Sequence, residues 1–150
     1  MIMKLLEKGD SEKIKIELND VWDIKYPYWY PLFDCNRQDV IAFDSEYIEN
    51  SDRLEIVRNL LREHGVKNVY EFREDGISNQ VIDFLDYEFW CSESYFCNIE
   101  CFWFDENMDW IIYVSHEGTT TFGGKWLIEQ LKIEWVDWRN NTSWDIKNKC

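Results

Sequence analysis

The stretch YFCNIECFWFDENMDWIIYVSHEGTTTFGG, residues 95–124, decides the fold class. It contains two apolar runs rich in aromatic and β-branched side chains, residues 95–104 and 109–116, which are separated by a polar connection with Glu106 and Asn107. Runs of this composition favour β-strands, and a short polar connection between two of them favours a hairpin. The stretch therefore predicts an antiparallel pair of strands.

Both faces of the first strand of this pair are apolar, because alternate residues of a strand point to opposite faces. One face holds Cys97, Ile99, Cys101 and Trp103, and the other holds Phe96, Phe102 and Phe104. On the second strand, one face holds Trp110, Ile112, Val114 and His116. A strand that is apolar on two faces is expected at the centre of a sheet that is covered on both sides.

The chain continues beyond the hairpin into a third strand and a helix. A Glu-Gly turn leads into the strand TTTF, residues 119–122, and a Gly-Gly pair leads into a helix over residues 125–138. In this helix Leu127, Leu131 and Trp135 recur one turn apart, which predicts a single buried stripe.

Seven further elements are predicted before the hairpin. They are a strand at 13–18, an extended aromatic loop at 26–33 that contains both prolines, a strand at 39–43, a helix from Ser51 to a stop at Gly65, a strand at 66–72, a turn at 74–76 and a short helix at 78–90 capped by Ser78. The polar tail, residues 140–150, is expected to be loose at its end. Helices and strands do not alternate strictly. The sequence therefore predicts one α+β domain over residues 1–150, with a mainly antiparallel sheet and two or three helices packed against it.

Charge and cysteine content limit the classes of function. The formal net charge is −14, so nucleic acid and anionic membrane surfaces would repel the protein, and a basic protein is the expected partner. No apolar run approaches the roughly 20 residues of a membrane span, and the start of the chain does not predict a signal peptide. Five scattered cysteines are typical of reduced thiols, which indicates the cytoplasm. The pattern does not indicate an oligomeric state.

The acidic residues are concentrated in the middle of the chain. No Lys or Arg occurs between Arg73 and Lys125. Eleven acidic residues lie in this interval: Glu74, Asp75, Asp83, Asp86, Glu88, Glu93, Glu100, Asp105, Glu106, Asp109 and Glu117. A field of one sign costs stability through self-repulsion, and its physical advantage is the steering of an oppositely charged partner. The interval is also rich in large aromatic side chains, which are common anchors of protein interfaces.

These observations predict an anionic docking surface for a basic protein. The residues expected to bind the partner are Asp83, Asp86, Glu88, Glu93, Asp105, Glu106 and Asp109. The alternative is a solvated acidic face that serves only solubility, although mixed charges serve that purpose at a lower cost.

The two histidines do not complete a catalytic set. His116 is interpreted as the last residue of a strand, where it seals the sheet edge by hydrogen bonding to the backbone. Ser115 and Glu117 alternate to the opposite face, so the three neighbours are not expected to form a triad. His64 lies at a helix end, where its positive form complements the helix dipole. No catalytic residue is therefore predicted.

No cofactor or metal site is predicted either. Cys97 and Cys101 on one strand would lie about 13 Å apart, which is too far for one zinc ion, so they are interpreted as buried thiols. Asp105, Glu106 and Asp109 lack the ligand spacing of an EF-hand. The Gly-Gly-Lys sequence near the end of the stretch lacks the earlier glycine and the hydroxyl residue of a phosphate-binding loop.

The segment FWFDENMDWIIYVSHEGTTTFGGKWL resembles the meander and final helix of small acidic immunity proteins of bacterial polymorphic and contact-dependent toxin systems. The resemblance covers roughly residues 95–135 and implies a protein that binds and neutralises a toxin domain, without assigning a role to any residue. We expect inhibition by occlusion of a cationic, nuclease-like site. Two alternatives remain open: a nucleic-acid mimic that inhibits a host defence enzyme, and a small carbohydrate-binding or hydrolase domain that uses a carboxylate pair.

Overall fold

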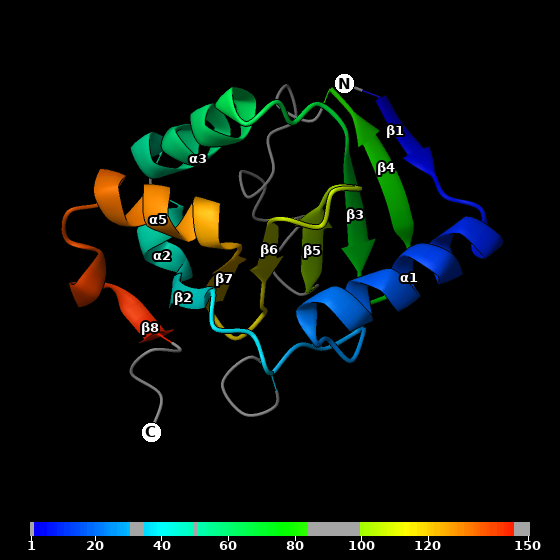
Figure 1. The fold of residues 1–150 in the computed structure, drawn as a ribbon, viewed down its shortest axis with the longest axis horizontal. Coiled ribbons are helices and arrows are strands. Elements are labelled where there is room, and N and C mark those ends of the chain that lie inside the picture. The colour runs from blue at the N-terminus through cyan, green and yellow to red at the C-terminus, as the bar shows by residue number, and fades with distance from the viewer. Residues whose placement is uncertain (1, 31–34, 50, 84–99, 146–150) are drawn as a thin grey trace.

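The computed structural model describes residues 2–30, 35–49, 51–83 and 100–145, which form an antiparallel sheet with helices on it (Figure 1). The strands are β1 (Ile2–Leu5), β2 (Val40–Asp44), β3 (Val69–Arg73), β4 (Ser78–Ile82), β5 (Cys101–Phe104), β6 (Ile111–Val114), β7 (Thr119–Gly123) and β8 (Thr142–Asp145). The helices are α1 (Lys8–Trp22), α2 (Ser45–Ile48), α3 (Ser51–Glu63), α5 (Lys125–Glu134) and the short 3-10 helix η2 (Trp138–Asn140). The predicted α+β class with a mainly antiparallel sheet is confirmed.

The eight strands have the order β1-β4-β3-β5-β6-β7-β2-β8, and each pair of neighbours is antiparallel. The predicted meander of β5, β6 and β7 lies in the middle of this order. Its first two strands pair with Phe102 opposite Tyr113 and Trp103 opposite Ile112. The hairpin and the third strand are therefore confirmed over the residues that the structure describes.

Each face of the sheet carries its own core. Trp103 and Ile112 point to a face where they pack with residues of α2, α3 and α5. Phe102 and Tyr113 point to the opposite face, where Trp22 of α1 belongs to the same core. In Figure 1 α2, α3 and α5 form one group, and α1 lies apart from them. The prediction of a central strand that is covered on both sides is correct.

Several further predictions agree with the structure. The helix expected from Ser51 is α3, the final helix is α5, and the strands expected at 39–43 and 66–72 are β2 and β3 with shifts of a few residues. Leu127, Leu131 and Trp135 are all buried, as the helical stripe required. The final helix ends at Glu134 rather than at residue 138. None of the helices in the described ranges is long and apolar enough to cross a membrane.

The strand predicted at 13–18 is wrong, because these residues lie within α1. The alternation of KIKIEL is a short fragment of a longer helical pattern, in which Ile14, Leu18 and Trp22 recur every four residues. Leu18 and Trp22 are buried, whereas Ile16 is 62% exposed. The spacing of apolar residues over all of α1 determines the structure here, and the alternation within KIKIEL alone does not.

The short helix predicted at 78–90 is also wrong where the structure describes it. Residues Ser78–Ile82 form β4, which pairs with β1 on one side and with β3 on the other. Pairing on both sides satisfies the backbone of this polar segment and overrides its weak helical pattern. The first half of the polar tail forms β8 at the sheet edge, and its end, residues 146–150, lies outside the described range, as do residues 84–90 and 95–99.

Glycine is required where the start of α5 contacts the β5–β6 connection. Gly124 has φ +112°, and a Cβ atom there would lie 2.3 Å from the carbonyl oxygen of Asp109. The Gly124 N–H group also donates to the carbonyl oxygen of Asp39 at 2.9 Å. The backbone therefore has no room to shift away from an added side chain.

We expect Gly124→Ala to lower the free energy of unfolding by about 1–3 kcal/mol, because it combines backbone strain with overpacking. Gly9→Ala is the matched control, since nothing lies within 4 Å of a Cβ atom at that helical position. The control is expected to be neutral or to stabilise by up to about 1 kcal/mol. Urea unfolding measures both, and equal effects would contradict the close approach at Gly124.

Candidate functional site

The connections of the sheet lie at two opposite ends. At the end that we call the turn end, Arg73 of β3 pairs with Cys101 of β5, and Cys101 pairs with Val114 of β6. At the opposite end, which we call the hairpin end, Phe104 pairs with Ile111 beside the β5–β6 connection. In the meander β5–β6–β7 each strand reverses direction, so the β5–β6 connection lies at the hairpin end and the β6–β7 turn lies at the turn end, where the β3–β4 turn also lies.

The predicted partner-binding acids lie mainly at the hairpin end. Asp83 follows β4 there, and Glu106 and Asp109 lie in the β5–β6 connection; all three are exposed. Asp105 is buried, with 5% of its surface exposed, so it is not available to a partner in this structure. Three further predicted residues lie outside the described range: Asp86, Glu88 and Glu93.

Other acids of the same sequence interval lie at the turn end. They are Glu74 and Asp75 in the β3–β4 turn, Glu100 before β5 and Glu117 in the β6–β7 turn. The acids that the structure describes therefore do not form one continuous patch. The described acids of the whole interval are thus divided between two ends because β5, β6 and β7 reverse direction at each turn, whereas the predicted partner-binding acids that are described lie at the hairpin end.

At the hairpin end, part of the acidic charge is compensated within the chain. His64 Nε2 lies 2.7 Å from Asp109 Oδ2, and the His64 ring stacks on Trp126 with a centroid distance of 3.8 Å. His64 does follow α3, as predicted, but it also fixes the β5–β6 connection against α5. Asp105 accepts hydrogen bonds from Trp110 Nε1 at 3.0 Å and from the Asn107 N–H group at 3.0 Å. Burial raises the pKa of the Asp105 carboxyl, and these hydrogen bonds oppose the shift.

At the turn end, Glu100 is the centre of a group of polar side chains. It is 4% exposed. Its Oε2 accepts a hydrogen bond from the Tyr113 hydroxyl. Its Oε1 lies 2.8 Å from His116 Nδ1 and 3.4 Å from Ser115 Oγ. Burial raises the pKa of Glu100 and nearby Glu74 adds to the shift, whereas Tyr113, His116 and Ser115 lower it.

This group corrects two expectations about the histidine region. His116 contacts a buried carboxylate rather than the backbone, and Ser115 reaches the same carboxylate instead of pointing to the opposite face. Strand β6 ends at Val114, so the alternation of a strand no longer applies to these residues. The Ser115 hydroxyl donates to Glu100 and accepts from the Glu117 N–H group at 3.0 Å. A catalytic triad requires a serine bonded to the histidine, and here the serine is bonded to the acid.

The sequence contained one indication of this group. In a hairpin with Phe104 opposite Ile111, position 100 falls opposite position 115. The predicted hairpin had strands at 95–104 and 109–116 and did not fix this register, so the observed pairing is needed to bring position 100 opposite position 115. The proximity of Glu74 to Glu100 could not be predicted from the hairpin, because it depends on the pairing of β3 with β5.

The predicted aromatic loop lies beside the turn end. The Tyr26 hydroxyl donates to the carbonyl oxygen of Arg73, and burial raises the pKa of Tyr26 to about 12. Trp29 is buried and its ring lies 6.0 Å from that of Tyr113. Tyr28 and Tyr30 are 45% and 51% exposed, and their rings lie 6.3 Å apart. The loop is therefore anchored in the core and also presents two aromatic rings to solvent. Residues 31–34 of this loop lie outside the described range.

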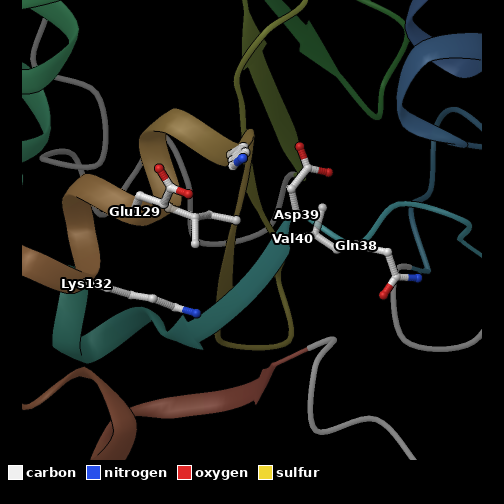
Figure 2. Close-up of a pocket in the computed structure, with 7 residues that line it drawn as sticks. Gln38, Asp39, Val40, Glu129 and Lys132 are labelled. Carbon is white, nitrogen blue, oxygen red and sulfur yellow. The ribbon is translucent and has the colours of Figure 1, made fainter.

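A pocket of about 320 Å³ lies elsewhere, between α5 and the start of β2 (Figure 2). Its lining residues are Gln38, Asp39, Val40, Lys125, Ile128, Glu129 and Lys132. Figure 2 shows Asp39 and Glu129 on different elements that border it. Both oxygens of Asp39 accept from Arg37, at 2.8 and 2.7 Å. Asp39 is therefore held in an ion pair with Arg37 at the border of this pocket.

No family model matches the chain, and no curated protein or solved structure is found to be similar to it.

Tyr113→Phe is expected to lower the free energy of unfolding by about 1–3 kcal/mol, because the buried Glu100 carboxylate loses a hydrogen bond that water does not replace. Tyr47→Phe is the matched control. It removes a 2.6 Å hydrogen bond to the exposed carboxylate of Asp137, so its cost is expected to be smaller. Denaturant unfolding measures the loss of unfolding free energy in both variants. A larger loss for Tyr47→Phe would contradict the expected importance of the hydrogen bond between Tyr113 and Glu100.

A second prediction concerns the buried Asp105. Its pKa is raised in the folded state, so in the interval between the unfolded and folded pKa values the folded protein binds more protons. Its contribution to the free energy of unfolding therefore falls as pH rises through this interval. Asp105→Asn cannot titrate, so the stability of the native protein relative to this variant should fall with pH there. Urea unfolding at a series of pH values measures the difference, and a rise with pH would contradict the assignment.

Proposed function

We propose that the protein is a protein-binding inhibitor that acts as an immunity protein in the cytoplasm. Its partner is a basic toxin domain with a cationic, nuclease-like site, which it neutralises by occlusion. The observation that carries the proposal is the combination at the turn end of three acids, the exposed Asp75 and Glu117 and the partly buried Glu74, with the exposed rings of Tyr28 and Tyr30. We call these five residues the docking surface.

Two contacts of the core support the combination of the aromatic loop with the acidic turns. Tyr26, in the same loop as Tyr28, is bonded to Arg73, which immediately precedes Glu74. On the other side of the loop, Trp29 packs on Tyr113, whose pKa is raised by burial, by its hydrogen bond to Glu100 and by nearby Glu74 and Glu117. The aromatic loop and both acidic turns therefore meet around one end of β5 and β6.

This arrangement fits the physics of a protein interface. Exposed tyrosines are frequent binding hot spots because they bury a large area and lose little conformational entropy. Acidic side chains around them would pair with the Lys and Arg groups that bind phosphate in a nuclease site. The structure supports the proposal further because both tyrosines are carried by a loop whose neighbours, Tyr26 and Trp29, are fixed in the core.

The acids of the hairpin end have a different part in the proposal. Asp83 and Glu106 lie at the far end of the sheet, where they add to the net charge of −14 without contacting the partner. Such charges increase the rate of association, and salt screens their effect. Acids divided between two ends also fit a nucleic-acid mimic poorly, because a mimic requires negative charges in a regular row.

The test uses the toxin domain encoded next to the gene, with binding and nuclease inhibition as readouts. Glu117→Lys and Glu106→Lys change the net charge equally, and both replace an exposed turn residue. Glu117→Lys should weaken binding about tenfold or more, mainly through faster dissociation, whereas Glu106→Lys should mainly slow association. Tyr28→Ala should also weaken binding by about tenfold or more.

Equal effects of the two lysine variants would show that the net charge acts without a defined surface. Association whose rate does not change between low and high salt would contradict the electrostatic part of the proposal. If the neighbouring gene product neither binds nor is inhibited, the assignment as an immunity protein is wrong.

A further inference from the structure

We propose that Glu74, Glu100 and His116 form a binding site for a divalent transition-metal ion, with Zn²⁺ as the expected ion. The three residues come from the β3–β4 turn, the residue before β5 and the β6–β7 turn. One ligand atom from each lies within 4.8 Å of the other two. The sequence analysis predicted no metal because these residues are far apart in the chain and follow no motif.

The donor set suits an ion of this class. One imidazole nitrogen and two carboxylate oxygens form a mixed set, which zinc accepts at about 2.0–2.2 Å. Atoms bound to one such ion lie roughly 3–3.5 Å from one another. Glu100 Oε1 and His116 Nδ1 are already 2.8 Å apart, so the pair would open slightly while Glu74 moves inward. The Glu74 side chain is only partly buried and belongs to a turn, which leaves it free to make this movement.

Electrostatics also favours a cation here. Glu100 is buried, and the nearby carboxylate of Glu74 makes its ionised form less favourable. The positive group that contacts Glu100 is His116, which is charged only when it is protonated. A divalent ion would compensate both carboxylates at once and would bind the neutral imidazole, so its effect would not depend on a protonated histidine.

The surrounding residues hold Glu100 in a suitable orientation. Tyr113 occupies Oε2, which leaves Oε1 directed toward His116 and Ser115. The Glu74 N–H group donates to the Glu100 carbonyl oxygen at 3.0 Å, so the two segments that carry the carboxylates are joined by their backbones. Partners that orient a ligand carboxylate in this way usually raise metal affinity.

The site is open on one side, because 47% of the His116 side chain is exposed. Three protein ligands leave at least one position of a tetrahedral zinc ion for water or for a group of another molecule. The site shares Glu74 with the docking surface but does not rest on the proposed function. It is tested on the protein alone, so the failure of one proposal is separate from the failure of the other.

The experiment is a titration of the full-length, reduced protein with Zn²⁺, followed by calorimetry and by the thermal unfolding midpoint. We expect one ion per chain and a rise in Tm with zinc concentration, as for any ligand that binds only the folded state. His116→Ala and Glu74→Gln should each weaken zinc binding about tenfold or more. His64→Ala is the matched control, because it removes the other histidine and should leave the affinity unchanged.

The Glu74→Gln variant is expected to fold, because the hydrogen bond from residue 74 to Glu100 is made by the backbone N–H group and is retained. Mg²⁺ should bind much more weakly than Zn²⁺, because imidazole is a poor ligand for magnesium. No binding at millimolar zinc would overturn the proposal. Binding that is unchanged in both His116→Ala and Glu74→Gln would also overturn it and would assign the ion to the thiols.

Discussion

The structure depends on the burial of β5 and β6 on both faces. Trp103 and Ile112 must be covered on one side of the sheet, and Phe102 and Tyr113 on the other. A single layer of helices cannot do both, so the chain places α2, α3 and α5 on one face and α1 with the aromatic loop on the opposite face. Because both faces are occupied around β5 and β6, a carboxylate within the sheet such as Glu71 is fully buried, and the acids of this region that reach solvent lie beyond the ends of the strands. The ends are therefore where function is to be sought.

The antiparallel topology then divides the acidic interval of the chain. Acids that are neighbours in sequence, such as Asp109 and Glu117, lie at opposite ends because β6 runs between them. Linear charge density is thus a poor guide to surface charge in a meander. Surface charge depends instead on which connections lie at the same end of the sheet, and this is determined by the strand order. The turn end gathers Glu74 and Glu117 from two connections because β3, β5 and β6 are consecutive in the sheet.

How much the sequence predicts depends on where each segment takes its stability. Helix α3 and the central meander have strong patterns of their own, and they were predicted closely. The strands β1 and β8 are the edges of the sheet, and apolar side chains of β1 stay exposed; Met3 and Leu5, for example, are 39% and 66% exposed. Strand β4 begins with Ser-Asn-Gln and owes its structure to the strands on both sides. Segments that are stabilised by neighbouring elements have a weak sequence pattern of their own. The environment of Glu100 is hard to predict for the same reason, because it is assembled from three connections.

The burial of Glu100 bears on both proposals, because each of them brings positive charge to the turn end. Exposed carboxylates such as Glu117 act over about one Debye length, roughly 8–10 Å, and salt weakens them. A carboxylate in the core is screened much less, but it acts only on a group that reaches it, and His116 at the open side is the group that does so here. In both proposals the two kinds of acid would act in sequence on an approaching cation: the exposed ones would attract it and the buried one would hold it. A metal ion and a lysine of a partner protein differ in size and in donor preference. Each would nevertheless be attracted first by exposed carboxylates, which salt screens, and then by the buried carboxylate, which salt screens much less.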